Sequence, residues 1–311
     1  MKPVILFAGG VTRWPHWEGP LRAALHDAQI DADLVTTAAP ETVDYILYAP
    51  GGDTPPDFTP FTRCKAVLSL WAGVERIVGN PTLTQPLCRM VDPGLTQGMV
   101  EYVTGHVLRA HLGIDALLSS QNGRWNPVVP PLASERPVAM LGLGALGTAC
   151  AKALAGLGFP VLGWSRRARD VSGIACLHGD AGLRAALRQA QIVVTLLPST
   201  PETENTLNAE TLSLLPRGAA LINPGRGTLI DDDALLAALA SGRVGHATLD
   251  VFRVEPLPPD HPFWAHPRIT VTPHVAADTR PSSAAHALAE NIRRSLAGEA
   301  LLHVVDRTAG Y

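Results

Sequence analysis

Three glycines that follow an apolar run constrain the fold of this chain more than any other feature. The run at 137–141 leads directly into Gly142, Gly144 and Gly147, spaced as G-x-G-x-x-G, and a helical pattern covers 145–157. In that context the first glycine permits a tight turn, the second lets backbone approach a pyrophosphate, and the third lets the helix pack close to the strand. The free N–H groups and the positive dipole at the helix start favour phosphate. The spacing predicts a dinucleotide-binding α/β domain; a glycine-rich turn without a ligand is the alternative.

Apolar runs alternate with helical patterns on both sides of this loop. After the glycines we predict strands at 160–164, 191–197, 219–223, 246–251 and 269–272, and helices at 180–190, 208–215 and 232–241. Before them we predict strands at 3–8, 45–50 and 64–70, a helix at 18–29 and helical spacing at 94–121, with a last helix at 281–297. This alternation indicates parallel sheets covered by helices. Because 311 residues exceed what one core normally organises, we predict two domains, a dinucleotide-binding domain at 100–280 and a substrate domain formed by 1–99 plus 281–311.

The composition narrows the classes of partner. Apolar residues make up 46% of the chain and charged residues 17%, which suffices for buried cores and excludes long disorder. A formal charge of −3 gives no reason to expect nucleic acid or a membrane as partner. The four cysteines lack the spacing of metal ligands, so we expect reduced thiols, no disulfide and no metal site. The N-terminal apolar run is too short for a signal peptide or a membrane span, and we expect a cytoplasmic protein.

A cluster of positive charge stands where a dinucleotide site often has an acid. The second strand of the predicted domain leads into Ser165, Arg166 and Arg167, and no Asp or Glu comes before Asp170. In an NAD site a carboxylate here binds the ribose 2′-hydroxyl, whereas a 2′-phosphate is repelled by that acid and needs hydroxyl and guanidinium donors. The cluster therefore predicts NADPH as the cofactor, with NADH as a weaker substitute. A solvated surface turn is the alternative.

Three charged or titratable side chains follow predicted strands of the second half. Arg226, Glu255 and His274 stand in "LINPGRGTLID", "TLDVFRVEPL" and "TVTPHVAADTRP", each just after an apolar run. The carboxyl ends of parallel strands meet at one edge of a sheet, where ligands of such folds bind. We therefore predict one site at that edge, although each residue alone is typical of a surface turn or a satisfied polar group.

These stretches carry a resemblance. With "SLWAGVERI" at 69–77, the glycine loop and "LLPSTPETENTL" at 196–207, they resemble the D-isomer-specific 2-hydroxyacid dehydrogenases over nearly the whole chain. Within that family, "GWSRR" and "TPHVAADTRP" are most similar to glyoxylate/hydroxypyruvate reductases of the A type. The resemblance implies two doubly wound α/β domains, the larger a Rossmann-type dinucleotide-binding domain and the smaller a flavodoxin-like substrate domain. It also implies a homodimer built largely by the larger domain and the helix near 99–118, whose apolar stripe motivates that expectation.

The activity implied by the resemblance is NADPH-dependent reduction of glyoxylate to glycolate and of hydroxypyruvate to D-glycerate. A related dehydrogenase for a bulkier 2-oxoacid, or a non-catalytic protein that senses NAD(P)H, is the alternative. Arg226 is implied to grip the carboxylate and the ketone oxygen of the substrate, His274 to donate a proton, and Glu255 to hold the imidazolium.

Further contacts carry over from the family to matching positions. The resemblance implies that backbone N–H groups of one loop bind the substrate carboxylate, with an indole walling the pocket; its residues are Leu70, Trp71, Ala72, Gly73 and Val74. It implies cofactor contacts by Ala145, Leu146, Leu197, Pro198, Thr203, Pro224, Gly225, Asp250 and Ala276, with Asp250 at the nicotinamide end. Where the family commonly has Asp after Gly-Val, this chain has Glu75. The sequence leaves open the roles of Trp14, Trp17, Trp264 and Arg280.

Overall fold

The computed structural model describes residues 2–50 and 57–310, and the chain folds into two compact units. One comprises Met1–Leu95 with Asp278–Tyr311 and is called the split unit; the other, Thr96–Ala277, is called the continuous unit. The predicted domain limits of 1–99 plus 281–311 and 100–280 lie within a few residues of these bounds.

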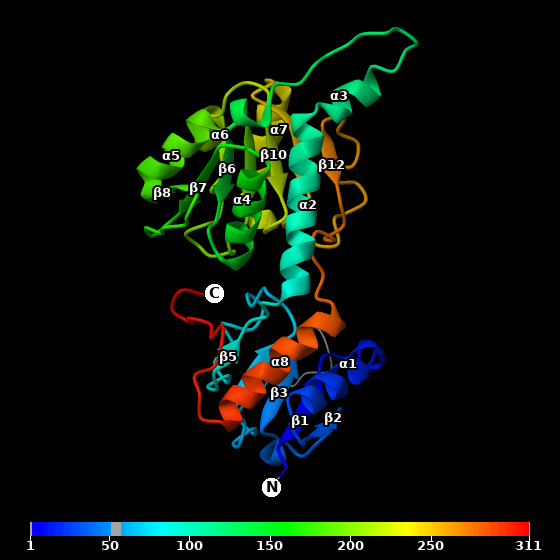
Figure 1. The fold of residues 1–311 in the computed structure, drawn as a ribbon, viewed down its shortest axis with the longest axis vertical. Coiled ribbons are helices and arrows are strands. Elements are labelled where there is room, and N and C mark those ends of the chain that lie inside the picture. Colours follow the sequence, from blue (N-terminus) through cyan, green and yellow to red (C-terminus); the bar gives the residue numbers. More distant parts are fainter. Residues whose placement is uncertain (1, 51–56, 311) are drawn as a thin grey trace. The chain divides into compact units, whose positions relative to one another are not determined.

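The split unit is built on five parallel strands in the order β2-β1-β3-β4-β5. These strands are β1 (Val4–Ala8), β2 (Asp33–Val35), β3 (Tyr45–Tyr48), β4 (Ala66–Ser69) and β5 (Leu87–Cys88). Helices α1 (Trp14–Asp27) and α8 (Pro281–Leu296) pack against each other, as the blue and orange ribbons in Figure 1 show. The strand order is that of flavodoxin-like sheets, so the predicted class of the smaller domain is confirmed.

The continuous unit contains seven parallel strands in the order β12-β11-β10-β9-β6-β7-β8. They are β6 (Val138–Leu141), β7 (Val161–Ser165), β8 (Ala175–His178), β9 (Ile192–Thr195), β10 (Ala219–Asn223), β11 (Val244–Leu249) and β12 (Ile269–Val271). The helices are α2 (Pro93–His111), α3 (Ile114–Ser119), α4 (Ala145–Gly156), α5 (Gly179–Gln189), α6 (Ala209–Ser213) and α7 (Asp232–Ala240). Counted from β6, the first six strands have the Rossmann order 3-2-1-4-5-6, which confirms the predicted fold class.

Helices cover both faces of this sheet. Successive side chains of a strand point to opposite faces, and in β6 Ala139 and Leu141 join a core cluster with residues of α5, α6 and α7. Val138 and Met140 join the cluster on the other face, with residues of α2 and α4. The central strand is therefore buried on both sides, which explains why it is a continuous apolar run.

The helical spacing at 94–121 does not form one helix. The helix α2 ends at His111, and Gly113 adopts φ 66° before α3 begins. Glycine has no Cβ and takes this left-handed conformation at little cost, so it ends the helix.

The apolar stripe on α2 belongs to the core of its own unit. Met99, Val103 and Val107 are at most 5% exposed and pack with residues of β6, β9 and α4. These three residues of the predicted stripe are therefore used inside the unit, whereas Leu112, also predicted to belong to it, is 43% exposed. That this helix takes part in a dimer stays a prediction.

Short edge elements escape the sequence pattern. Strands β2 and β8 were not predicted, and β8 carries only half-buried or exposed side chains at the edge of its sheet. Helix α1 begins at Trp14 rather than at 18, with Pro15 in its first turn, where the missing N–H of proline costs nothing.

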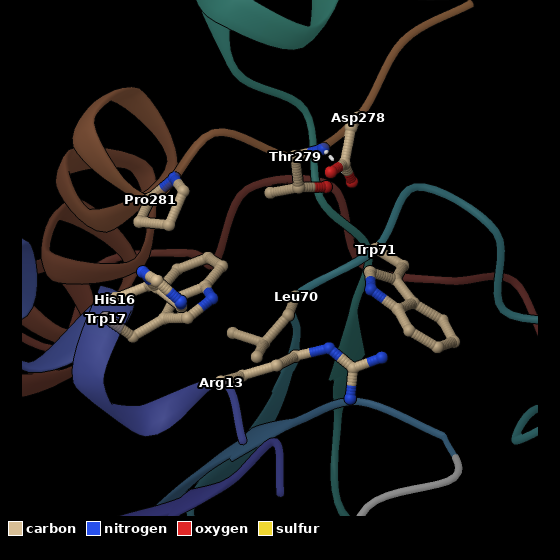
Figure 2. Close-up of a pocket in the computed structure, with 8 residues that line it drawn as sticks. All are labelled: Arg13, His16, Trp17, Leu70, Trp71, Asp278, Thr279 and Pro281. Carbon is tan, nitrogen blue, oxygen red and sulfur yellow. Dashed lines mark hydrogen bonds between the residues drawn. The ribbon is translucent and has the colours of Figure 1, made fainter. Parts of the chain in front are cut away.

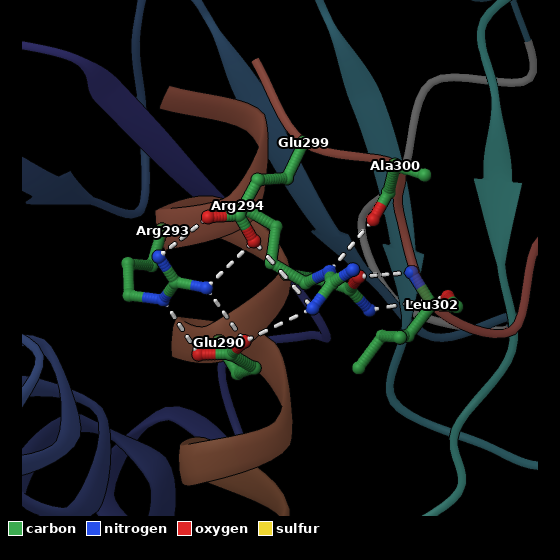
Figure 3. A network of polar contacts seen from close by, with 7 residues as sticks. Glu290, Arg293, Arg294, Glu299, Ala300 and Leu302 are labelled. Carbon is green, nitrogen blue, oxygen red and sulfur yellow. Dashed lines mark hydrogen bonds and ion pairs between the residues drawn. The ribbon is translucent and has the colours of Figure 1, made fainter. Parts of the chain in front are cut away.

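A polar network fixes the segment that follows α8 (Figure 3). The guanidinium of Arg293 pairs with Glu290 and Glu299 at 2.8 and 2.9 Å. Arg294 Nε donates to the Ala300 carbonyl at 2.6 Å. Exposed ion pairs contribute little one by one, but together these contacts tie the last segment back to the helix.

All four cysteines are free thiols, and burial raises the pKa of Cys150 to about 12 and of Cys64 and Cys88 to about 11. In residues 2–50 and 57–310, no helix is long and apolar enough to cross a membrane. Over the same ranges, no three His, Cys, Asp or Glu side chains gather in a group that could hold a metal ion.

Candidate active site

The glycine loop lies between β6 and α4, and β6 is the strand at which the order of the sheet reverses. Ligands of open α/β sheets bind at this reversal. Gly142 has φ 113°, and a Cβ there would stand 2.4 Å from the Leu196 carbonyl oxygen. A Cβ on Gly147 would stand 1.8 Å from the oxygen of Gly142. Both positions therefore require glycine for the loop to close on the helix.

Gly144 differs from the other two glycines. A Cβ there would meet no atom within 4 Å, and the residue is exposed at the start of α4, where it precedes Ala145. No side chain caps this helix. The first turn of α4, with Leu146, thus presents backbone N–H groups to open space, which is what a pyrophosphate needs. The cradle fits a dinucleotide.

The polar cluster after β7 contains groups that already have partners. Ser165 is 9% exposed, and its hydroxyl donates to the Arg167 carbonyl at 2.8 Å. The exposed Arg166 lies 3.4 Å from a Glu202 oxygen. A ribose phosphate held here would draw the Ser165 hydroxyl and Arg166 away from these contacts. An exposed ion pair of this kind is weak and easily exchanged.

One arginine of the cluster was given no role by the sequence. Arg169 Nη1 donates to the Leu143 carbonyl at 3.1 Å, inside the glycine loop. It therefore braces the loop against the segment that follows β7.

Arg226 follows β10 in a turn closed by Asn223. The Asn223 side chain donates to the Arg226 carbonyl at 2.9 Å and accepts from the Gly225 N–H at 3.1 Å. Gly227 has no room for a Cβ, which would stand 2.0 Å from the carbonyl carbon of Phe252. The turn is thus packed against the segment that leads to Glu255, and the Arg226 guanidinium is half-buried there.

His274 and Glu255 form a hydrogen-bonded pair. His274 Nδ1 lies 2.8 Å from Glu255 Oε2, and the other carboxylate oxygen accepts from the Phe252 N–H at 2.9 Å. His274 Nε2 makes no hydrogen bond with the described residues, and its side chain is 51% exposed. The pair therefore holds the imidazole by one nitrogen and leaves the other open to a ligand.

The electrostatics of this pair favour an imidazolium beside a carboxylate. The hydrogen bond to Glu255 raises the pKa of His274 above its ordinary value, against burial and the charge of Arg226. Burial works to raise the pKa of Glu255, but hydrogen bonds from His274 and the Phe252 N–H, with the nearby charges, lower it overall. Arg226, Glu255 and His274 follow β10, β11 and β12, so the three predicted residues lie at the carboxyl edge of one sheet, where the charge of Arg226 acts on both pKa values.

Asp250 organises the loop that carries His274. Asp250 is fully buried; one of its oxygens accepts from Thr272 Oγ1 at 2.6 Å and from the Val275 N–H at 2.9 Å, and the other from the Ala276 N–H at 2.9 Å. The His274 N–H donates to the Asp250 carbonyl at 2.8 Å. His274 itself has φ 54°, a conformation that non-glycine residues seldom adopt. Asp250 is therefore a positioning residue, a role that the sequence did not indicate.

Tyr102 extends this network from α2. Its hydroxyl lies 2.7 Å from Thr272 Oγ1, the group that donates to Asp250. No sequence signal places Tyr102 near a residue 170 positions later.

The remaining predicted cofactor contacts lie in segments that follow β9, β10 and β12. The Thr203 hydroxyl bonds within its own loop, donating to the Pro198 carbonyl at 2.6 Å. The others, Leu197, Pro224, Gly225 and Ala276, are buried. Their contacts with a cofactor remain predictions.

The loop from Leu70 to Val74 lies in the split unit and is described there by itself. The Trp71 N–H already donates to Ser69 Oγ at 3.1 Å. The N–H groups of Ala72, Gly73 and Val74 make no hydrogen bond with the described residues. Three successive amides thus have no partner among the described residues, although Val74 itself is buried. Their contact with a substrate remains a prediction.

The residues without a predicted role have clear contacts. Trp14 and Trp17 pack on Phe7, with ring centroids 5.1 and 6.2 Å away. Arg280 donates to the Gly94 carbonyl at 2.8 Å. Trp264 is half-exposed and donates to the Pro258 carbonyl at 2.9 Å. The first two tryptophans thus contact an aromatic core residue, and Arg280 and Trp264 contact backbone carbonyls.

Comparison with known proteins gives concordant matches. Residues 105–276 match the model of the D-isomer specific 2-hydroxyacid dehydrogenase NAD-binding domain. A D-isomer specific 2-hydroxyacid dehydrogenase from Xanthobacter autotrophicus Py2, in complex with NADPH and MES, is 41% identical over 100% of both chains, with a TM-score of 0.92. An NADPH-dependent glyoxylate/hydroxypyruvate reductase from Sinorhizobium meliloti, in complex with NADP and sulfate, is 34% identical over 100% of both chains, with a TM-score of 0.85. A probable 2-hydroxyacid dehydrogenase from Rhizobium etli CFN 42, in complex with NADP, HEPES and tartaric acid, is 30% identical over 100% of this chain and 99% of that one, with a TM-score of 0.88.

Proposed function

The chain belongs to the D-isomer-specific 2-hydroxyacid dehydrogenase family, and on that premise we propose that it is an NADPH-dependent reductase of short 2-oxoacids. Its proposed reactions are glyoxylate to glycolate and hydroxypyruvate to D-glycerate. The observation that carries the proposal is the His274–Glu255 pair beside Arg226 at the carboxyl edge of the continuous unit's sheet. The name of the Sinorhizobium meliloti relative supports the choice of substrates.

The proposed cofactor is NADPH, with NADH as a weaker substitute. The glycine cradle would hold the pyrophosphate, and Ser165, Arg166 and Arg167 would bind the 2′-phosphate through hydroxyl and guanidinium donors. All three related structures compared above contain NADPH or NADP, which supports this choice. When bound in this cradle, NADPH would supply the hydride for reduction of the carbonyl carbon.

Residues of the chain itself would donate the proton and stabilise the negative charge of the substrate. His274, protonated beside Glu255, would give the proton on Nε2 to the carbonyl oxygen as negative charge develops there. Glu255 would stay ionised and hold Nδ1, which fixes the imidazole orientation. Arg226 would bind the substrate carboxylate and carbonyl oxygen with its planar fork. In the split unit, the N–H groups of Ala72, Gly73 and Val74, which make no hydrogen bond with the described residues, are proposed as donors to a substrate carboxylate.

The alternative of a non-catalytic NAD(P)H sensor is less well supported. A sensor needs the glycine cradle but has no use for a proton donor with a raised pKa. The test is NADPH absorbance with glyoxylate, then with a panel of 2-oxoacids and both nucleotides. NADPH oxidation with a short 2-oxoacid is expected, a preference for bulkier 2-oxoacids would favour the related dehydrogenase, and no oxidation with any would contradict the proposal.

We also propose that the protein is a homodimer. The segment 117–132, which extends away from the sheet of its own unit in Figure 1, exposes several large apolar side chains. Trp125 is 96% exposed and Val129 88%. A second copy that covers them would remove this apolar area from water. Light scattering should return twice the mass of one chain, and a mass near 32.9 kDa would count against the dimer. A cytoplasmic location remains a prediction from the sequence.

A further inference from the structure

A cavity of about 230 Å³ lies within the split unit, at the carboxyl edge of its sheet. Its walls come from the start of α1, the loop after β4 and the start of α8 (Figure 2). The start of α1 follows β1, where the strand order of this sheet reverses. Such reversals are the places where open α/β sheets bind ligands.

Arg13 is the cation of this cavity. Figure 2 shows its side chain passing beneath Leu70 toward Trp71, and the guanidinium carbon lies 5.3 Å from the indole centroid. Arg13 Nη1 donates to the Gly9 carbonyl at 3.0 Å. Arginine has five N–H donors, and the others make no hydrogen bond or ion pair with the described residues. The guanidinium is therefore held in place while most of its donors remain available.

The rest of the lining mixes apolar and polar side chains. Trp17, Leu70, Trp71 and Pro281 are apolar, and the Trp71 ring lies beside the guanidinium, whereas His16, Asp278 and Thr279 are polar. The carboxylate of Asp278 accepts from the Thr279 N–H at 2.8 Å. A fixed cation beside apolar rings suits a short carbon chain that ends in an oxygen.

The cavity adjoins the amides assigned above to the substrate carboxylate. Trp71 lines the cavity and directly precedes the free N–H groups of Ala72, Gly73 and Val74. A 2-oxoacid bound to these amides by its carboxylate would thus have the cavity beside it for the group attached to its carbonyl carbon.

We propose that this cavity binds the C3 substituent of the 2-oxoacid, and that Arg13 makes the enzyme prefer substituents that carry a hydrogen-bond-accepting oxygen. The inference rests on the proposed reductase function and adds a specificity-determining residue to it. The shared chemistry is an acceptor oxygen, which either a hydroxyl or a second carboxylate supplies.

The test compares kcat/KM for substrates that differ at C3. Hydroxypyruvate and 2-oxobutyrate have nearly the same shape and differ by a hydroxyl in place of a methyl group, while glyoxylate has no C3. In Arg13→Met we expect the hydroxypyruvate to 2-oxobutyrate ratio to fall by about 10- to 100-fold, the effect of losing a hydrogen bond from a charged group. Arg13→Gln, which keeps an amide donor, should lie between. Oxaloacetate, which carries a second carboxylate, distinguishes the two possible acceptors. If Arg13→Met lowers kcat/KM for oxaloacetate more than for hydroxypyruvate, Arg13 prefers a carboxylate.

Arg22→Met is the matched control, because Arg22 lies on the same helix and pairs with Glu18 at 3.0 Å, outside the cavity lining. Its ratio should equal that of the unmodified enzyme. If the unmodified enzyme reduces glyoxylate and neither Arg13 variant, folded by circular dichroism, changes the ratio, this inference is wrong and the reductase proposal stands. If the unmodified enzyme reduces no 2-oxoacid, both fail.

Discussion

The glycine loop and the loop that carries His274 stand at the same edge of one sheet but are held by different means. The glycine loop depends on the absence of side chains at two positions, since a Cβ on Gly142 or Gly147 would overlap backbone atoms. The His274 loop is shaped by hydrogen bonds to a buried carboxylate, Asp250, on another segment. The cofactor cradle thus depends on sterics, within its own turn and against Leu196, whereas the proton donor depends on hydrogen bonds to a buried carboxylate. Substitutions that separate these two dependences test the comparison.

The largest effect is expected from His274→Gln. A placed proton donor contributes about 10²–10⁴-fold to the rate, so kcat for glyoxylate reduction should fall by that factor. NADPH affinity, measured by fluorescence titration, should stay nearly the same because the glycine loop is independent of the imidazole. A variant with near-normal turnover would place the proton donor elsewhere.

The next effect concerns the choice of nucleotide. Replacing Arg167, or Arg166, with Ala should weaken NADPH binding by about 1.5–3 kcal/mol, the contribution of a charge-assisted hydrogen bond, and leave NADH almost unaffected. Only NADPH carries the 2′-phosphate. The exposed Arg188 of α5 is the control, and Arg188→Ala should change neither affinity. Equal losses of affinity for both nucleotides would contradict the assignment of these residues to the 2′-phosphate.

The glycines themselves give a matched pair. In Gly147→Ala the new Cβ would stand 1.8 Å from the Gly142 oxygen, and the resulting shift should lower the free energy of unfolding by about 1–3 kcal/mol. In Gly144→Ala the Cβ meets no atom within 4 Å, so thermal stability should hold while NADPH affinity falls. Denaturant unfolding and nucleotide titration of both variants measure the difference. Equal destabilisation would contradict the division of roles between these glycines.

The pH profile should respond to Glu255→Gln. The hydrogen bond that His274 donates to Glu255 raises the pKa of His274, so the protonated donor persists to higher pH when this carboxylate is present. Loss of the carboxylate should lower that pKa and move the alkaline limb of kcat/KM for reduction to lower pH. An unmoved limb would show that Glu255 does not set the protonation of His274. Below the limb the donor is charged in both proteins, so the difference there should be small.

The smallest effect is expected from Tyr102→Phe. It removes the hydroxyl that lies 2.7 Å from Thr272 Oγ1, a hydrogen bond that contributes about 0.5–1.5 kcal/mol. Stability and kcat should both fall slightly while NADPH affinity is kept. Tyr48→Phe is the control, since the Tyr48 hydroxyl makes no hydrogen bond in the described part of the chain. A lower NADPH affinity in Tyr102→Phe would mean that the two loops are coupled after all.

The sequence by itself determined the features that depend on near neighbours. The glycine spacing after an apolar run predicted the turn between β6 and α4, because the close approach of Gly147 to the Gly142 oxygen is decided within six residues. The contact of Gly142 with Leu196 lies outside that stretch. Alternating apolar runs predicted the central strands of both sheets, since buried strands must be apolar on both faces. Arg226, Glu255 and His274 were predicted at one edge because each follows an apolar run, and the strands β10, β11 and β12 do precede them.

Only the tertiary structure decided features that depend on distant partners. The stripe of Met99, Val103 and Val107 is apolar whether it faces its own sheet or another chain, and packing alone shows that it is internal. Asp250 was predicted as a cofactor contact from the family resemblance, and that contact stays a prediction. The structure adds that its oxygens accept from two N–H groups and a hydroxyl that lie 22 to 26 positions later. Tyr102 enters the same network from a helix 170 positions away. A hydrogen bond forms between groups that are close in three dimensions, and the periodicity of apolar residues in the sequence does not show which distant groups come close.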